Sequence, residues 1–415
     1  MINCKTSLST LLLLLLLLSA TLAQARTCNS GLPSHLYDVN DNLSLGAEFR
    51  AFYMGASLGE NMPQSEDDRV FKNNYALAAR AMLDWYIVEN LTFLFEGEWR
   101  FKFPGWEEKF ARHNDFRLNQ LLLEYDPEFM RLIAGVQSVS FGSTALLDQV
   151  MLGVTLGFRF ESLTFNVFGG VANRNAMRNA SNSMFMAYTS YTNGWKLVSE
   201  NTWENYLAGL DLTAFLSDSI RLNFLYLLSW PELEPLRSHS FAINFDGSFF
   251  ENRLSTIVEA IAILNSDNKL MPALVVDIRG KLFENFWLRA GTALAFNYTE
   301  EELPSPVFEN LSWGLIQRFN LHQGKIARLG VNWQANQYVN PFADYYMAFL
   351  SKQENDGSGF DFDTSDELDV GVEFNYQKYY KIKVSYAGMN LFNAPTSSHM
   401  VYLALRIILG GQFND

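Results

Sequence analysis

The chain has 415 residues, a formal net charge of −14 and an aromatic content of 15%. An acidic balance of this size argues against nucleic acid as a partner. No apolar run after residue 25 approaches the roughly 20 residues of a membrane-spanning helix, so membrane insertion would require a closed β-barrel.

The N-terminal segment has the pattern of a secretory signal peptide. Lys5 supplies the positive start, Leu11–Leu18 the apolar run and Ala23–Ala25 the small-residue cleavage site. We therefore predict a signal peptide over residues 1–25. Cys28 is the single cysteine after it, so no internal disulfide is expected, and its role stays open.

The next segment, 26–42, is polar and irregular, and we interpret it as a periplasmic lead-in. From residue 43 to 415 apolar and polar residues alternate, which is typical of strands whose side chains face opposite ways. In the hairpin 75–102, for example, Leu91, Phe93 and Phe95 lie on one face of the strand. The residues between them belong to the opposite face, which carries a charged row further along. The predicted strands are 43–54, 75–87, 91–102, 116–125, 131–139, 151–160, 163–172, 203–216, 220–229, 239–248, 253–264, 273–282, 286–297, 311–321, 326–335, 366–376, 380–389 and 399–409.

The connections between these strands alternate between tight and long. Tight ones include 88–90, 217–219 and 322–325, whereas 173–202 and 336–365 are long. This alternation is typical of outer-membrane barrels, which carry short turns on one side and longer loops on the other. The sequence therefore predicts an all-β fold, a transmembrane antiparallel up-and-down β-barrel of about 18 strands, with 16 as the alternative count.

Charged residues recur on the face that would turn toward the lumen of such a barrel. The predicted pore-lining residues are Arg50, Arg80, Asp84, Glu96, Glu98, Arg100, Arg117, Arg131, Arg159, Arg221, Arg289, Arg328 and Arg406. The same face also holds Glu48, Lys102, Asp211, Glu259, Asp277, Arg279, Asp369, Glu373, Lys381 and Lys383. Two interpretations stay open: a charged conduit that selects a solute, or cross-strand ion pairs that keep a water-facing wall in register.

The segment 116–170 resembles the corresponding hairpin of the alginate-export porin family. The matching residues are Arg117, Gly135, Gln137, Gly142, Leu147, Asp148 and Gly170. The resemblance implies passive export of an anionic exopolysaccharide through an arginine-lined barrel gated by loops. This sequence departs from the pattern at Val136, where the family resemblance calls for arginine, and its lumen mixes acids with the arginines.

Two loops are candidates for further roles. Loop 140–150, with Asp148, is a candidate constriction loop or an ordinary external loop. Loop 336–365 carries Asp356, Asp361 and Asp363, but their spacing does not match a calcium-binding loop, so a solvated acidic loop is expected.

Catalysis has little support in the sequence. The five histidines show no metal-ligand spacing, and no nucleophile elbow or phosphate loop occurs, so no metal and no cofactor is expected. His239 between Ser238 and Ser240 is the nearest candidate for a barrel-embedded lipid hydrolase.

We expect a porin, not an enzyme, that carries a polar or charged solute or a polysaccharide across the outer membrane of a Gram-negative bacterium. Its expected partners are outer-membrane lipid and, during biogenesis, the barrel-assembly machinery. The alternative is a surface barrel without transport, such as an adhesin or a structural protein.

Overall fold

A computed structural model describes eleven segments of the chain, all of them strands with their turns. These segments are 37–57, 73–103, 113–141, 147–177, 205–231, 238–264, 269–296, 325–352, 361–376, 380–389 and 398–409. Within these segments there is no helix long and apolar enough to cross a membrane. The predicted signal peptide lies outside the described residues.

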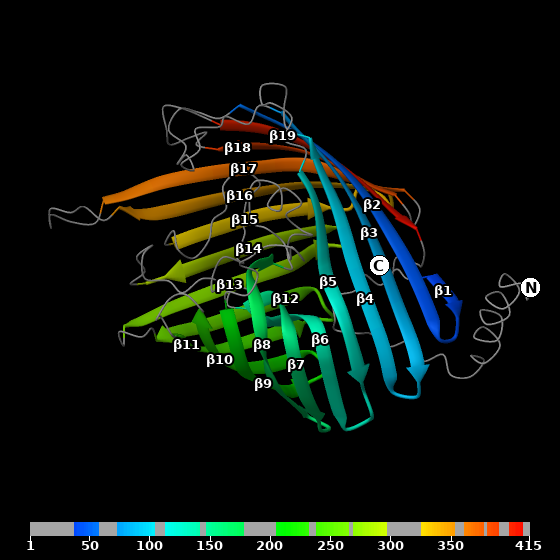
Figure 1. Ribbon diagram of the computed structural model, residues 1–415. Helices are drawn as coiled ribbons and strands as arrows, with labels where there is room; N and C mark the ends of the chain where they lie inside the picture. Colours follow the sequence, from blue (N-terminus) through cyan, green and yellow to red (C-terminus); the bar gives the residue numbers. More distant parts are fainter. Residues whose placement is uncertain are drawn as a thin grey trace, which may run out of the picture.

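The strands follow one another along the chain and around the barrel (Figure 1). They are β1 (Tyr37–Asn40), β2 (Leu43–Ser57), β3 (Asn73–Val88), β4 (Leu91–Phe103), β5 (His113–Tyr125), β6 (Met130–Phe141), β7 (Leu147–Arg159), β8 (Leu163–Met177), β9 (Asn205–Ser217), β10 (Ile220–Pro231), β11 (Ser238–Phe249), β12 (Leu254–Leu264), β13 (Leu270–Phe283), β14 (Phe286–Ala295), β15 (Lys325–Trp333), β16 (Val339–Lys352), β17 (Asp361–Tyr376), β18 (Tyr380–Met389) and β19 (Ser398–Leu409).

Eighteen of these strands close into one antiparallel ring. Each strand from β2 to β18 pairs with the next, and β19 pairs back onto β2, with Arg406 opposite Arg50. The predicted barrel and its strand number are confirmed. The short β1 lies within the predicted lead-in and pairs with the first residues of β2, with Tyr37 opposite Leu45.

The connections alternate between the two ends of the ring as predicted. Connections of two to five residues, such as 89–90 and 284–285, join strands at what we call the short-turn end. The opposite end, which we call the long-loop end, carries connections of five residues or more, such as 58–72 and 178–204. Asn90 adopts a left-handed conformation (φ 63°), which asparagine tolerates in tight turns.

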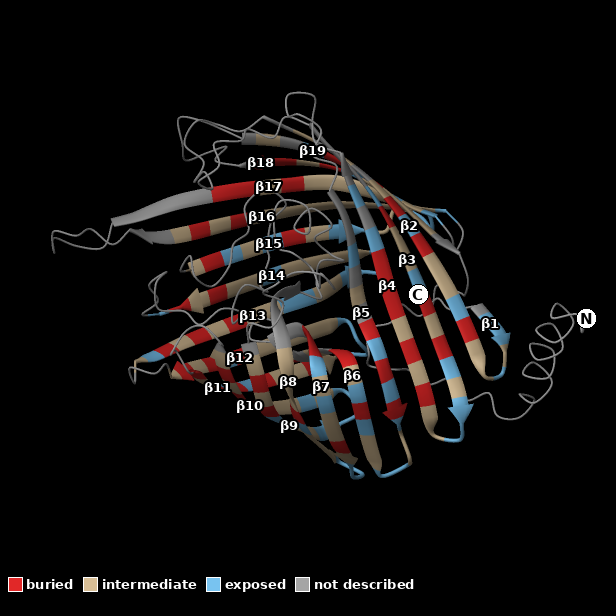
Figure 2. Ribbon diagram, viewed as in Figure 1, coloured by how far each residue is buried: buried red, intermediate tan, exposed pale blue. Residues whose placement is uncertain are grey.

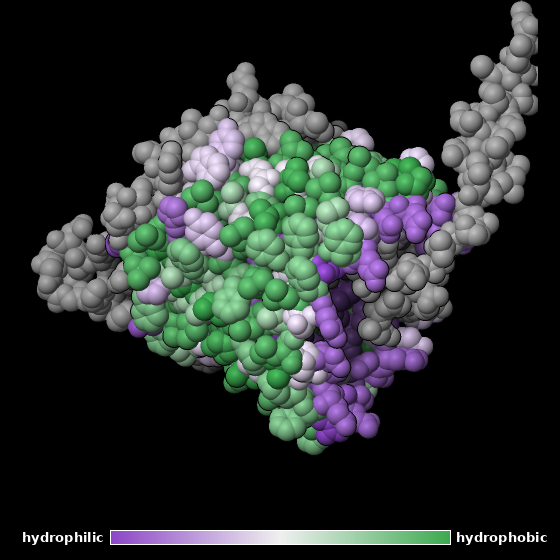
Figure 3. Space-filling view, turned by 90° about the horizontal axis from the view of Figure 1, so that it is seen from below, coloured by the Kyte–Doolittle hydropathy of each residue, from purple (hydrophilic) through white to green (hydrophobic). Residues whose placement is uncertain are grey.

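The two faces of the wall differ in polarity. The outward face exposes large apolar side chains, among them Leu45, Phe49, Leu77, Trp85, Trp99, Leu123, Val154, Phe241, Ile243, Leu329, Phe374, Val401 and Leu403. The inward face of β2–β4 buries Glu48, Arg50, Asp84, Glu96 and Glu98. Figure 3 shows a broad hydrophobic surface beside a hollow rimmed by hydrophilic side chains. The charged row of hairpin 75–102 therefore faces inward, as predicted.

One predicted loop was wrong, and one predicted strand, 311–321, lies outside the described residues; in the ring, β14 pairs directly with β15. The segment predicted as loop 336–365 contributes β16 and the start of β17. With β16 the ring has eighteen strands. β16 escaped detection because Phe342, Tyr346 and Ala348 face inward, so neither of its faces is uniformly polar.

A β-bulge explains the poor alternation of β5. Glu96 pairs with Gln120, but the next residue, Gly97, pairs with Leu118, so Asn119 is an extra residue. The bulge shifts the alternation by one position. Leu118 therefore faces outward while Gln120 faces inward, where it is buried.

A line of glycines crosses the inner wall at the place where β5 and β6 separate. Gly135, Gly153 and Gly170 are direct cross-strand partners on β6, β7 and β8. Gly135 has φ 129°, and a Cβ at any of the three would lie within 2.3–2.4 Å of a neighbouring backbone oxygen. Only glycine permits so close an approach. We call this line the glycine crease.

The hydrogen-bonded pairing between β5 and β6 is short. Only Leu121–Tyr125 pair with β6, whereas residues 113–120 of β5 pair with β4 alone. In Figure 1, β5 continues upward beside β4 past the point at which it leaves β6. Leu118 packs there against Val136 and Val150, which are buried.

Candidate functional site

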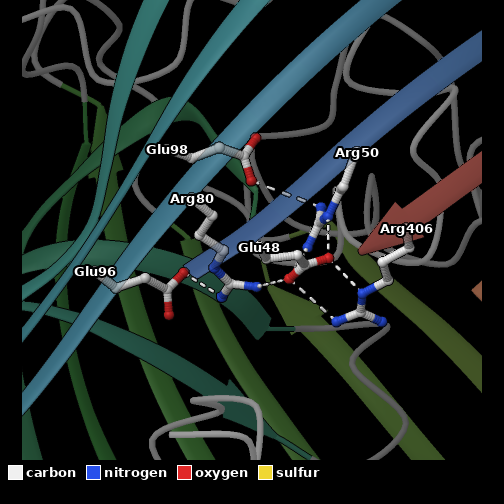
Figure 4. Close-up of polar contacts among 6 residues, drawn as sticks. All are labelled: Glu48, Arg50, Arg80, Glu96, Glu98 and Arg406. Atoms are coloured by element: carbon white, nitrogen blue, oxygen red, sulfur yellow. Dashed lines mark hydrogen bonds and ion pairs between the residues drawn. The ribbon is translucent and has the colours of Figure 1, made fainter. Parts of the chain in front are cut away.

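Six charged side chains meet on the inner wall where β19 closes onto β2 (Figure 4). They are Glu48 and Arg50 of β2, Arg80 of β3, Glu96 and Glu98 of β4, and Arg406 of β19. We call this group the seam cluster. Its three arginines and three glutamates give a formal charge of zero.

Glu48 is the centre of the seam cluster. Arg50 donates to it through Nε (2.5 Å) and Nη2 (3.0 Å), and Arg406 donates through Nη2 (3.2 Å). Arg406 Nε also lies in ion-pair contact with the Glu48 carboxylate. Arg80 Nη1 lies 3.5 Å from the same carboxylate and also pairs with Glu96. The Glu48 side chain is 1% exposed. A buried charge of this kind is tolerated because three cations neutralise it and satisfy its lone pairs.

The strand register explains why the seam cluster forms. Arg406 lies directly opposite Arg50, and like charges in that position repel each other. Glu48, on the same face as Arg50, accepts from both arginines and removes the repulsion. Arg80 lies opposite Glu48 on the other side, so the cluster extends from β19 to β4.

Further ion pairs continue around the inner wall, all but Arg159–Asp126 between neighbouring strands. They are Arg131–Glu124 (2.6 Å), Arg159–Asp126 (2.8 Å), Arg221–Asp246, Arg289–Asp277 (2.5 Å), Arg328–Asp344 (2.8 Å) and Lys381–Glu373 (2.6 Å). Asn166–Asp211 (3.1 Å) and Asn223–Asn244 (2.9 Å) are hydrogen-bonded in the same way. The predicted charged row is therefore, over the described residues, largely a set of cross-strand pairs.

Arg279 is different from the other inward arginines. It lies opposite Arg289, whose guanidinium is engaged by Asp277. Arg279 is exposed and, among the described residues, has no carboxylate within salt-bridge distance. Its charge is available to a solute in the lumen.

The long-loop half of the inner wall is apolar and buried from β6 to β16. Its residues include Phe141, Met151, Phe168, Leu207, Leu225, Leu227, Ile261, Ile263, Met271, Val275, Ile326 and Ala348. Along β13 to β15, Figure 2 shows buried positions toward the long-loop end and exposed positions toward the short turns. The water-accessible part of the described inner wall is thus the part that carries Arg221, Arg279 and Lys381.

The structure brings most predicted pore-lining residues to the inner face. Arg50, Arg80, Asp84, Glu96, Glu98, Arg131, Arg159, Arg221, Arg289, Arg328 and Arg406 all point inward by the strand register. The side chains of Arg100 and Arg117 lie outside the described residues. That these residues line a conducting pore stays a prediction.

The predicted constriction loop 140–150 was wrong in its boundaries. β6 continues to Phe141, and β7 begins at Leu147. Asp148 is therefore a strand residue opposite Ser140. Asp246 and Asp344 were not predicted, because Asp344 lies on β16, which was expected to be a loop, and the pairing of Asp246 with Arg221 depends on strand register.

The hydrolase candidate does not form a site. His239 faces outward and contacts Tyr226, whereas Ser238 and Ser240 are fully buried on the inward face. The described part of the chain holds no group of three His, Cys, Asp or Glu side chains arranged for a metal ion.

Comparison with solved structures finds the same barrel. Acinetobacter baumannii OccAB4 matches with a TM-score of 0.60 and 10% identity over 89% of this chain and 98% of its own. Pseudomonas aeruginosa OccK3 (OpdO) matches with a TM-score of 0.60 and 11% identity over 90% and 97%. Pseudomonas aeruginosa OccK5 (OpdH) matches with a TM-score of 0.56 and 13% identity over 89% and 98%.

No protein-family model and no curated protein matches the chain. At identities of 10–13% the structural likeness shows the fold, a large closed β-barrel. It does not extend to the alginate-export family suggested by residues 116–170.

Proposed function

We propose that the protein is an outer-membrane channel that carries a polar or charged solute passively, and that it is not an enzyme. One observation carries this proposal: an eighteen-strand ring has an apolar outer face and an inner wall with charged, water-accessible side chains. This polarity is the reverse of that in a soluble barrel, and it suits a barrel that is surrounded by lipid and has an aqueous interior. The solved Occ and Opd structures share this closed-barrel fold.

This function places the chain in the outer membrane of a Gram-negative bacterium after removal of a signal peptide. Outer-membrane lipid would then cover the outward side chains, and the barrel-assembly machinery would insert the chain. Fractionation with the outer membrane, together with a gel mobility that changes on heating, tests this placement. Recovery in the soluble periplasm would contradict it.

The charge pattern bears on the kind of solute. Nearly every described inward arginine is paired with a carboxylate, so the wall lacks the strong positive field that a single-sign row would create. This favours a small polar solute over an anionic polymer. Exopolysaccharide export is the second solute class; it rests on the resemblance of residues 116–170, and anion permeation well above cation permeation would support it.

Planar-bilayer recording tests the channel. Folded protein is expected to produce ion current steps, and the reversal potential in a potassium chloride gradient gives the sign of the permeating ion. Absence of current from protein that shows native heat-modifiable mobility would overturn the channel proposal.

The second candidate is a surface barrel without transport. The burial of the inner wall from β6 to β16 favours it, because a packed interior leaves less room for a solute. The same bilayer recording separates the two. A third class, a lipid hydrolase, would require that lipid hydrolysis occurs and is lost in His239→Ala.

A further inference from the structure

Two histidines occupy equivalent positions on the outward, apolar face of the barrel. His239 is the second residue of β11 and His399 is the second residue of β19. Each contacts a tyrosine of the preceding strand: Tyr226 for His239 and Tyr386 for His399. Neither pair belongs to the interior that the channel proposal uses.

The two Tyr–His pairs share one geometry. The Tyr hydroxyl lies 2.8 Å from Nδ1 of His239 and 2.6 Å from Nδ1 of His399. The ring centroids are 6.1 and 6.0 Å apart, with interplanar angles of 29° and 27°. In both hairpins the tyrosine is two residues from the direct cross-strand partner of the histidine, so the contact is diagonal.

Both pairs lie at the long-loop end. His239 follows connection 232–237 and His399 follows connection 390–397. The hairpins β10–β11 and β18–β19 are eight strands apart, which is nearly opposite in a ring of eighteen. Beside the first pair, Tyr206 stacks on Trp230 (5.6 Å) and Tyr226 packs on Phe241 (5.1 Å). Such aromatic groups collect at the boundary between hydrocarbon and headgroups.

The chemistry of each pair suits an acceptor from the membrane surface. When the Tyr hydroxyl donates to Nδ1, the ring proton is on Nε2, which is then a donor. Protonation of the ring makes Nδ1 donate to the Tyr oxygen, keeps the Nε2 donor and adds a positive charge. Phosphate oxygens are strong acceptors for such a donor.

We propose that the Tyr226–His239 and Tyr386–His399 pairs bind phosphate groups of lipid headgroups at the long-loop boundary of the membrane. Tyrosine fixes the imidazole orientation, and the imidazole contacts the phosphate. Two sites on nearly opposite walls fix the depth of the barrel on both sides. The inference rests on the proposed membrane placement, but not on ion conduction.

Histidine NMR in phosphate-free maltoside micelles tests the proposal. Protein labelled at histidine Cε1 is titrated with diphosphoryl lipid A, with the same lipid after enzymatic removal of its phosphates, and with inorganic phosphate. The resonances of His239 and His399, assigned by His239→Phe and His399→Phe, are expected to shift with the phosphorylated lipid alone.

The controls separate the alternatives. Tyr226→Phe keeps the ring stacking and removes the hydroxyl, so it is expected to weaken the His239 response and leave that of His399 intact. An equal shift with dephosphorylated lipid would overturn the proposal in favour of ordinary aromatic packing, and a shift with inorganic phosphate alone would exclude the lipid as its source. Unchanged resonances in protein that inserts into membranes would overturn the lipid sites while leaving the proposed function intact; failure to insert would overturn both.

Discussion

At the scale of single residues, Glu48 is the group on which closure of the ring depends most. It contacts arginines of both strands that form the closing pair, Arg50 of β2 and Arg406 of β19, and Arg80 of β3. Glu96 also pairs with Arg80 and Glu98 with Arg50, whereas Arg406 pairs only with Glu48 within the seam cluster. A change at Glu48 therefore affects three cations together.

Glu48→Gln is expected to lower the free energy of unfolding by about 3–5 kcal/mol, because it removes the buried carboxylate that three guanidinium groups share. Guanidinium titration of the barrel in phospholipid vesicles measures the change. Glu89→Gln, in the exposed β3–β4 turn, is the matched control and should be nearly neutral. Equal stability of Glu48→Gln and the native chain would show that the seam cluster does not hold the closure.

Arg279 is the residue with which a passing ion would interact most directly. Arg279→Glu replaces a positive by a negative charge; each unit charge at about 4 Å in water is worth about 1 kcal/mol. We expect the reversal potential to move toward cation preference. Arg279→Lys keeps the charge and should leave it unchanged. An identical reversal potential in both variants would place Arg279 away from the ion path.

At the scale of elements, the glycine crease shapes the wall from β6 to β8. Two of its members, Gly135 and Gly170, are residues through which segment 116–170 resembles the alginate-export porins. Their role in this chain is structural: each allows backbone atoms of neighbouring strands to approach where a Cβ would collide. Close packing of neighbouring strands, without a shared solute, is enough to explain these two matches.

Gly153→Ala is expected to cost about 1–3 kcal/mol, because its Cβ would lie 2.3 Å from the Gly169 oxygen, and backbone must move to accept it. Gly280→Ala is the matched control: its Cβ would meet only Leu254 Cδ1 at 3.9 Å. Thermal unfolding by circular dichroism compares the two. Similar melting temperatures for both variants would contradict the role of the crease.

The strands of this barrel differ in how well the sequence predicts them. Strands such as β3 and β4 were found because lipid-facing and inward residues contrast in polarity at every second position. β16 was missed because the aromatic residues Phe342 and Tyr346 face inward, which removes that contrast. The bulge at Asn119 likewise breaks the period without any turn residue to mark it.

The inner wall was predicted in its residues but not in its interactions. Alternation shows that Arg221 and Arg328 face inward, yet their partners Asp246 and Asp344 stand on neighbouring strands. Which residues meet across strands depends on register, and register depends on the whole ring. The buried apolar half of the inner wall was not predicted either. An apolar residue such as Ile263 fits the alternation of a strand equally well whether it faces the interior or the lipid.

At the scale of the whole molecule, the apolar outer face predicts sensitivity to charge according to depth. Val154→Arg, in the middle of β7, is expected to cost about 2–4 kcal/mol in a bilayer, whereas Val88→Arg, beside the β3–β4 turn, should cost about 0–1. Guanidinium titration in vesicles measures both. Equal costs at the two positions would contradict membrane insertion in this orientation.

The short pairing between β5 and β6 has a consequence for the width of the barrel. In a fully paired ring, the number of strands and their stagger together set the circumference. From Leu121 and Val136 toward the long-loop end the ring is not fully paired, because β5 and β6 no longer pair there. At the short-turn end every neighbouring pair of strands is joined by hydrogen bonds, while at the long-loop end the spacing between β5 and β6 is set by side-chain packing such as that of Leu118 on Val136 and Val150.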